Sequence, residues 1–143
     1  MQVNAYINFN GNCLEAMSFY KDCLGGELQV IKVKDTPAGA SCPGGTEDQV
    51  MHSSLVNKGF VIMATDMVDP GGFKPGNNFS LSVNCTSEEE LNRTFNAIME
   101  GGNIVEPIKL QFWGDLFGYG SDKFGTRWMF NYTKTPQPAV QAN

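Results

Sequence analysis

His52 is the one histidine in the chain, and imidazole is the side chain best suited to move protons near neutral pH. It is therefore the only candidate for a catalytic base, and the only nitrogen ligand of the imidazole type for a metal ion. One histidine completes neither role, because a base needs an orienting partner and a metal needs several ligands. A hydrogen-bonded structural or pocket histidine is the interpretation that the residues favour, and the catalytic residues stay unknown.

Cysteines are the second kind of reactive group, at Cys13, Cys23, Cys42 and Cys85. No two of them form a CxxC pair, and no Cys–His spacing matches that of a structural zinc site. We expect free thiols and not a disulfide framework, with Cys13 and Cys23 lying within a helix.

The charge and hydropathy of the chain argue against several kinds of partner. The 143 residues carry a net charge of −5 and no lysine or arginine cluster, so we expect no nucleic acid and no membrane partner. The apolar runs, such as residues 60–64, are too short to span a bilayer. Residues 1–4 lack the charged and apolar regions of a signal peptide, and a cytoplasmic location is expected.

Two segments share the same helix signals: a capping residue, a glutamate three residues later, and a Gly-Gly pair at the end. One segment begins at Asn12, with Glu15 as the capping-box partner, and the other begins at Ser87, with Glu90 in that role. Their Gly-Gly ends lie 76 residues apart, slightly over half the chain. This spacing predicts one structural unit written twice.

Each predicted helix follows one strand-like segment and precedes three more, in the order β-α-β-β-β. The segments of the first half are residues 6–10, 27–34, 50–56 and 60–66, and those of the second are 79–85, 104–113, 116–121 and 127–133. The pattern predicts an α+β fold.

The two halves are predicted to form one domain of residues 1–143, because a module of about 70 residues is marginal alone. Module 1 covers about residues 1–68, module 2 covers about 76–135, and residues 136–143 form a flexible tail. The Gly- and Pro-rich residues 66–77 link the halves. A second long loop, residues 35–48, is either a binding loop or a plain surface excursion.

Three segments carry a family resemblance: YINFNGNCLEAMSFYKDCLGGEL (residues 6–28), MHSSLVNKGFVIMATD (51–66) and FWGDLFGYGSDKFGTRWMFNY (112–132). In this order they resemble PhnB-like proteins of the glyoxalase/bleomycin-resistance/extradiol dioxygenase (vicinal oxygen chelate) superfamily. The resemblance implies two βαβββ modules whose curved mixed sheets surround a cavity, with helices on the outer face, and it implies a homodimer. Some PhnB-like proteins carry a methyltransferase label, yet the sequence lacks the Gly-rich turn of a nucleotide-cofactor methyltransferase.

Side chains alternate along a strand, so each strand offers two faces. In the predicted strands one face is apolar and the other mixed, and the mixed faces carry few lysines or glutamates. The apolar sets are Trp128, Phe130 and Tyr132, and Phe79, Leu81 and Val83; the mixed sets are Arg127, Met129 and Asn131, and Asn78, Ser80 and Ser82. We expect the mixed faces to line a cavity, because binding sites combine apolar walls with a few polar groups; plain exposed surface is the competing interpretation.

The hairpin at Lys58 and Gly59 decides how the first half is oriented. A two-residue loop pairs Asn57 with Phe60 and places His52 and Ser54 on the face of Met63 and Thr65. A three-residue loop would reverse this assignment.

Glyoxalase-type relatives hold a divalent metal at four inward positions, and the resemblance carries these to Ala5 or Tyr6, Met63, Asn78 and Met129. A thioether is a poor ligand for such an ion, and alanine is no ligand. We therefore expect no metal and no cofactor.

The function predicted is metal-free binding of an unidentified small molecule. The candidate ligand-binding residues are His52, Ser54, Met63, Asn78, Ser80, Trp113, Arg127, Met129 and Asn131. Arg127 is the one cation on a mixed face and is assigned to an anionic head group, although its place near a strand end also allows solvent exposure. A lyase- or isomerase-type enzyme, with an unconventional metal site or metal-free acid/base chemistry, is the first alternative. An interaction module that buries a partner chain is the second.

Overall fold

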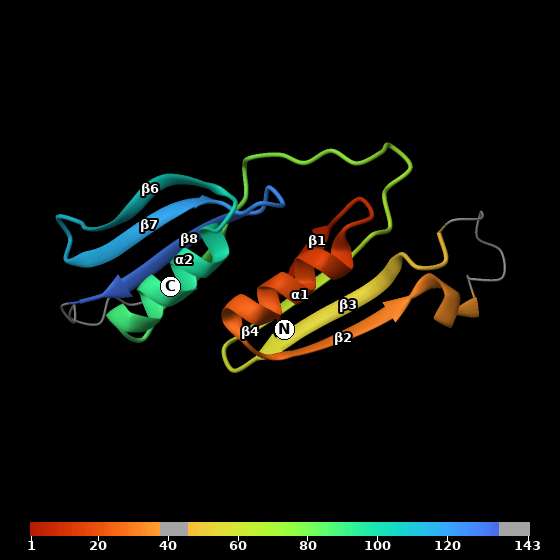
Figure 1. The fold of residues 1–143 in the computed structure, drawn as a ribbon, viewed down its shortest axis with the longest axis horizontal. Helices are drawn as coiled ribbons and strands as arrows, with labels where there is room; N and C mark the ends of the chain where they lie inside the picture. The colour runs from red at the N-terminus through yellow and green to blue at the C-terminus, as the bar shows by residue number, and fades with distance from the viewer. Residues whose placement is uncertain (38–45, 135–143) are drawn as a thin grey trace. The chain divides into compact units, whose positions relative to one another are not determined.

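The computed structural model describes residues 1–37 and 46–134, and the chain divides into two units (Figure 1). The first unit is Met1–Lys74, and the second begins at Pro75. The middle of the loop predicted at residues 35–48, the tail at 136–143 and Cys42 lie outside the described residues.

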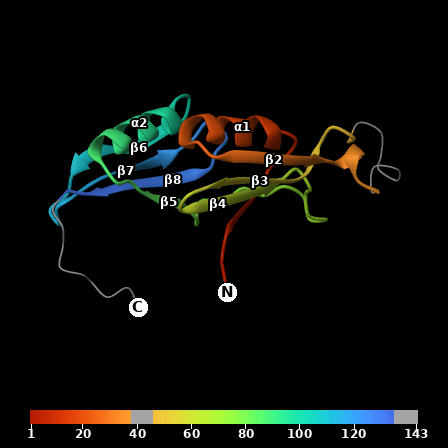
Figure 2. The same cartoon turned by 90° about the horizontal axis from the view of Figure 1, so that it is seen from below.

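The first unit is a four-stranded mixed sheet with one long helix. Its elements are β1 (Ala5–Asn8), α1 (Cys13–Leu24), β2 (Glu27–Lys32), the 3-10 helix η1 (Val33–Asp35), β3 (Val50–Asn57) and β4 (Phe60–Thr65). The strand order is β1-β4-β3-β2, in which β1 runs parallel to β4 and the other pairs are antiparallel. The helix α1 covers one face of this sheet (Figure 2).

The second unit repeats this arrangement. Its elements are β5 (Leu81–Asn84), α2 (Glu88–Met99), β6 (Asn103–Leu110), β7 (Asp115–Ser121) and β8 (Arg127–Thr133). The strand order is β5-β8-β7-β6, with β5 parallel to β8. The α+β class and the predicted βαβββ repeat are therefore confirmed.

The repeat extends to the register of the parallel strand pairs. Tyr6 is the partner of Met63 in the first unit, and Ser82 is the partner of Met129 in the second. Directly after β1, Phe9 N donates to the carbonyl of Thr65 at 2.8 Å. Directly after β5, Cys85 N donates to the carbonyl of Asn131 at the same distance. Equivalent positions can therefore be compared directly.

The helix starts differ from one another. At α2 the capping signal is confirmed, because Ser87 Oγ accepts from Glu90 N at 3.0 Å, while the Glu90 carboxylate accepts from Thr86 N at 2.9 Å. At α1 it is wrong, because the Asn12 side chain makes no capping bond. The carboxylate of Asp66 takes its place and accepts from Gly11 N at 2.8 Å and Cys13 N at 3.0 Å.

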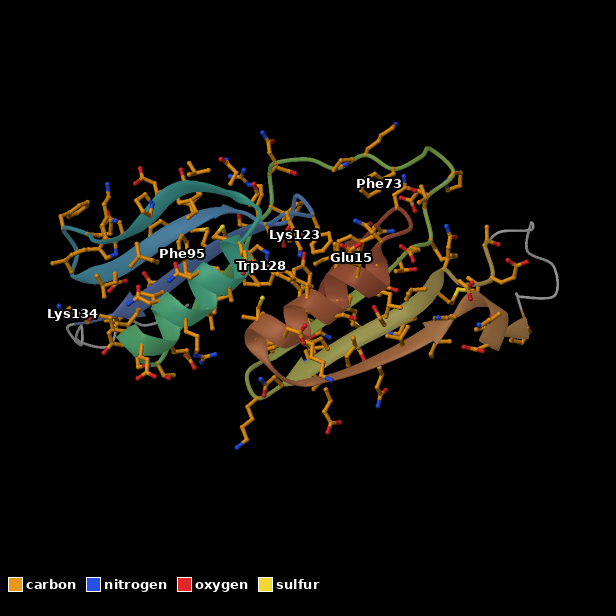
Figure 3. All side chains as sticks on the ribbon, in the orientation of Figure 1. Glu15, Phe73, Phe95, Lys123, Trp128 and Lys134 are labelled. Atoms are coloured by element: carbon orange, nitrogen blue, oxygen red, sulfur yellow. The ribbon has the colours of Figure 1, made fainter. Side chains whose placement is uncertain are left out.

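The core of the second unit is aromatic. Two of its residues, Phe95 of α2 and Trp128 of β8, are labelled in Figure 3. Phe95 meets Phe130 of β8 edge to face, with ring centroids 5.6 Å apart, and Trp128 stacks on Phe130 at 6.1 Å. Gly118 and Gly120 of β7 are buried on this helix-covered side, where an added Cβ on Gly118 would lie 2.8 Å from the side chain of Ile108. The missing Cβ at Gly118 therefore leaves the space that Ile108 occupies.

Three predictions about strand faces and ends are wrong. Phe79 is 83% exposed and precedes β5, so it does not belong to an apolar core face. Trp113 lies after β6 in the turn that leads to β7, not at the end of a strand. The helix-covered face of β3 is also not uniformly apolar, because Ser53 is buried there and donates to the carbonyl of Ala64 at 2.9 Å.

Candidate functional site

In each sheet the helix covers one face and leaves the other uncovered. We call the uncovered face of the first unit's sheet the first open face and that of the second unit's sheet the second open face. The register assigns the strand residues to these faces. The first open face carries Tyr6, Ile31, His52, Ser54, Val56 and Met63, and the second carries Ser82, Phe117, Tyr119, Arg127, Met129 and Asn131. The opposite sides hold fully buried residues such as Leu55, Ala64 and Phe130.

Three of the predicted site residues meet on the first open face. Asn57 pairs with Phe60, as a two-residue turn requires, and Gly59 has the positive φ of 91° that favours glycine there. Ser54 and Met63 are therefore direct cross-strand partners, and His52 lies two residues along the same face of β3.

His52 has a partner that the sequence did not provide. The Tyr6 hydroxyl lies 3.0 Å from His52 Nδ1, at hydrogen-bonding distance, and the two ring centroids are 5.6 Å apart. Either group can be the donor, depending on the histidine tautomer. A tyrosine–histidine pair of this kind can orient the imidazole for binding or relay a proton.

The second open face also brings predicted residues together. Arg127, Met129 and Asn131 alternate along β8 on this face, and each is half-buried. Phe117 and Tyr119 of β7 were missed, although they pair directly with Asn131 and Met129. The alternation of Gly118 and Gly120 was the available signal, because glycines packed under a helix place the residues between them on the other face.

The remaining predicted residues lie outside the strands. Asn78 and Ser80 are exposed and precede β5, so the strand register assigns them to neither open face. Trp113 is 42% exposed in the β6–β7 turn, and its ring centroid lies 6.5 Å from that of Phe117. It therefore extends the aromatic residues of the second open face from beyond the strand.

The donors at the superfamily's metal positions do not fit a divalent ion. The register selects Tyr6 over Ala5 in the first unit and makes Ser82, not Asn78, the equivalent in the second. With Met63 and Met129, the set contains two thioethers and no carboxylate or imidazole, which is poor chemistry for zinc, nickel, iron or manganese. Within residues 1–37 and 46–134, no group of three or more His, Cys, Asp or Glu side chains is arranged to hold a metal.

Two buried carboxylates support the sheets. Asp66, 3% exposed, accepts from Val50 N at 2.9 Å in addition to the two N–H groups at the start of α1. Asp122, also 3% exposed, accepts from Phe124 N, Thr126 N and Trp128 Nε1 at 2.8–3.0 Å, and it closes the turn before β8. Because both are saturated with donors on the helix-covered side, their role is structural.

Cys13 and Cys85 are free thiols, as predicted. Burial is the main cause that raises the pKa of Cys13 from its ordinary 9.0 to about 11, while the Ser53 hydroxyl at 3.5 Å opposes the shift. Burial likewise raises the pKa of Cys85. A thiol that holds its proton is a weak nucleophile, so neither cysteine suits covalent catalysis.

Paired βαβββ units are the architecture of the glyoxalase/bleomycin-resistance fold, and solved structures agree. A protein of that family from Burkholderia phytofirmans, 15% identical, aligns over 92% of this chain and 99% of its own, with a TM-score of 0.59. PA1353 from Pseudomonas aeruginosa is 37% identical over 94% of this chain and 99% of its own, with a TM-score of 0.83.

The family assignment follows from the sequence comparisons. The family described as 3-demethylubiquinone-9 3-methyltransferase matches residues 1–130. Protein YjdN of Escherichia coli K12 is 32% identical over 94% of this chain and 97% of its own. A PhnB protein from Bacillus cereus is 24% identical over 92% of this chain and 99% of its own, with a TM-score of 0.71. The chain belongs to this PhnB-like family.

The helices give no sign of a membrane anchor in the part of the chain that the structure describes. None of them is both long enough and apolar enough to cross a bilayer.

Proposed function

We propose that this PhnB-like protein binds a small molecule on its open sheet faces without a metal ion. The observation that carries the proposal is the donor set: Tyr6, Met63, Ser82 and Met129 stand where the superfamily implies metal ligands. The same side chains suit an organic ligand, because thioether, hydroxyl and aromatic groups combine apolar contact with a few hydrogen bonds.

Methyl transfer, which the family's description names, has little support in this fold. A nucleotide methyl donor is usually bound by a Gly-rich turn that opens a helix in a larger α/β domain. The described strands form two four-stranded mixed sheets with one long helix each, which is a different architecture. Binding therefore accounts for the observed residues with fewer added assumptions.

A second candidate function, an enzyme with acid/base chemistry, is favoured by the Tyr6–His52 pair. The hydrogen bond between them supplies the orienting partner that a lone histidine lacks. In such an enzyme the pair would shuttle one proton in a lyase- or isomerase-type step, with Ser54 on the same face to contact the substrate. The enzyme and binding functions differ in whether the bound compound is consumed.

A homodimer also belongs to the proposal. Ile31 and Val56 on the first open face are large apolar side chains that are 46% and 47% exposed. Burial of these side chains against a second copy would stabilise the pair. Light scattering on the purified protein should give twice the chain mass, and Val56→Lys should shift it to one chain; a monomeric wild type would contradict the dimer.

The main test combines elemental analysis with a thermal-shift screen. Protein purified without an affinity tag should contain no stoichiometric metal, and His52→Ala should leave the metal content unchanged. A compound that binds the folded state should raise the melting temperature, and at 100 times its Kd it adds about 2.7 kcal/mol of stability. Stoichiometric zinc, nickel, iron or manganese that disappears in His52→Ala would contradict metal-free binding.

Each stabilising compound should then be incubated with the protein and followed by mass spectrometry. Intact compound after prolonged incubation supports binding. Consumption that falls about 100-fold in His52→Ala and in Tyr6→Phe, but not in the control Lys58→Ala on the hairpin, would establish the enzyme instead.

A further inference from the structure

A row of aromatic rings runs along β7 on the second open face. The ring centroids of Trp113 and Phe117 are 6.5 Å apart, and those of Phe117 and Tyr119 are 5.9 Å apart. Phe117 and Tyr119 are half-buried, and Trp113 is 42% exposed, so part of each side chain stays accessible. Rings at these separations favour stacked or edge contacts with a further planar group.

Arg127 lies beside this row with an unmet hydrogen-bonding group. Its Nε is buried and has no hydrogen-bond partner in the part of the chain that the structure describes. A buried cationic donor left without an acceptor is costly, so an anion that pairs with it would be stabilising. At the other end of the row Lys109, the partner of Phe117 on β6, already forms an ion pair, with its Nζ 3.2 Å from the Glu106 carboxylate.

The strand register places the cation at one end of the aromatic row. Ser121 is the partner of Arg127, and Tyr119 is the partner of Met129, the next residue on that face of β8. Phe117 and Ser121 are four residues apart on β7, which spans roughly 13 Å of strand. A flat molecule of that length can lie across Phe117 and Tyr119 and reach Arg127 with an acidic group.

We propose that the second open face binds a planar aromatic carboxylate, with the rings against Phe117 and Tyr119 and the carboxylate on Arg127. The proposal rests on the small-molecule function above and narrows it to one class of ligand. A single carboxylate fits because one guanidinium balances one negative charge, and its fork of N–H donors matches two carboxylate oxygens. The Met129 thioether contributes contact with the ring edges.

The test compares two probes of one shape by isothermal titration calorimetry on the full-length chain. Naphthalene-2-carboxylate carries the charge, and naphthalene-2-carboxamide replaces the carboxylate with a neutral amide. The carboxylate should bind at least about 10-fold more tightly, as expected for one charge-assisted hydrogen-bonding contact. Equal affinity of the two probes for the wild type would overturn the proposal.

Variants of the protein test separately where the carboxylate and the rings of the ligand bind. Arg127→Met should weaken the affinity for the carboxylate by about 10- to 100-fold and leave the affinity for the amide unchanged, while the matched control Arg93→Met, at an exposed position of α2, should change neither affinity. Arg127→Lys, which keeps the charge and loses the fork, should give an intermediate affinity, and it covers the case in which Arg127→Met does not fold. Phe117→Ala should lower the affinity for both probes. Phe79→Ala, which removes an exposed ring outside the face, should lower neither affinity.

Failure here can be separated from failure of the general function. Arg127→Met that binds the carboxylate as the wild type does would overturn the assignment to Arg127. If neither probe binds, the proposal that the ligand is an aromatic carboxylate is overturned. The general small-molecule function still stands if another compound in the thermal-shift screen stabilises the protein.

Discussion

The two units share one strand order, yet the starts of their helices are held in different ways. In the second unit Ser87 and Glu90 cap α2 from within its own first turn. In the first unit the donors at the start of α1 bind Asp66, 53 to 55 residues along the chain. The same topology thus rests on a local contact in one unit and a long-range contact in the other. We expect α1 to depend on the completed sheet more strongly than α2 does.

The largest effect should come from Asp66→Ala. The substitution leaves the N–H groups of Gly11, Cys13 and Val50 without their acceptor, which should cost about 3–5 kcal/mol of unfolding free energy. In hydrogen exchange resolved by residue, the substitution should accelerate amide exchange more in α1 than in α2, relative to the wild type. Asp69→Ala, at an exposed aspartate three residues on, should change stability by less than about 0.5 kcal/mol. Equal acceleration in both helices would remove the distinction between the units.

A second effect concerns the thiol at the start of α1. Because burial raises the pKa of Cys13 from 9.0 to about 11, the unfolded chain loses this proton at lower pH than the folded chain does. The resulting stability is fully present below pH 9 and is lost as the pH rises through about 11, an amount of about 2 kcal/mol. Chemical denaturation at a series of pH values should show a shallower decline for Cys13→Ala. An identical slope in the variant would contradict the assignment.

The local cap of α2 should contribute less. Ser87→Ala removes the acceptor of Glu90 N and should cost about 1 kcal/mol. Asn12→Ala at the equivalent position of α1 should cost little, because the Asn12 side chain makes no capping bond. Urea denaturation of the two variants measures the difference. A loss in Asn12→Ala as large as that in Ser87→Ala would mean that both helices are capped locally.

The smallest effect is expected at the Tyr6–His52 pair. Tyr6→Phe removes one hydrogen bond between partly exposed side chains and should lower stability by less than about 0.5 kcal/mol. The 15N shift of His52 Nδ1 should nevertheless change in NMR spectra, because its partner is gone. A stability loss above 1 kcal/mol would assign this pair to the structural framework of the first unit, not to its open face.

Local chemistry in the sequence was enough to predict several elements correctly. The Lys58-Gly59 turn set the register of β3 and β4, which placed Ser54 opposite Met63. The Ser87 cap was visible because its partner, Glu90, is three residues away. In each case the two interacting groups are close neighbours in the chain, where spacing alone determines the geometry.

The failures share a physical cause. Alternation continues through Asn78 and Ser80, but the ladder between β5 and β8 begins only at Leu81, so the pattern extended the strand too far. Asp66 and Tyr6 were missed as partners because the groups that they contact, Cys13 N and His52 Nδ1, are brought near by the fold. The nearness of Tyr6 to His52, for example, follows from two strand pairings, β1 with β4 and β4 with β3.

The edge strand β6 bears on the solubility of the protein. It exposes Ile104, Val105 and Leu110, the kind of apolar strand that could add to the sheet of a second molecule and start a fibril. Two register shifts interrupt its ladder with β7, and Pro107 within it has no N–H to donate. These irregularities make β6 a poor template for pairing with another chain, although its edge is apolar.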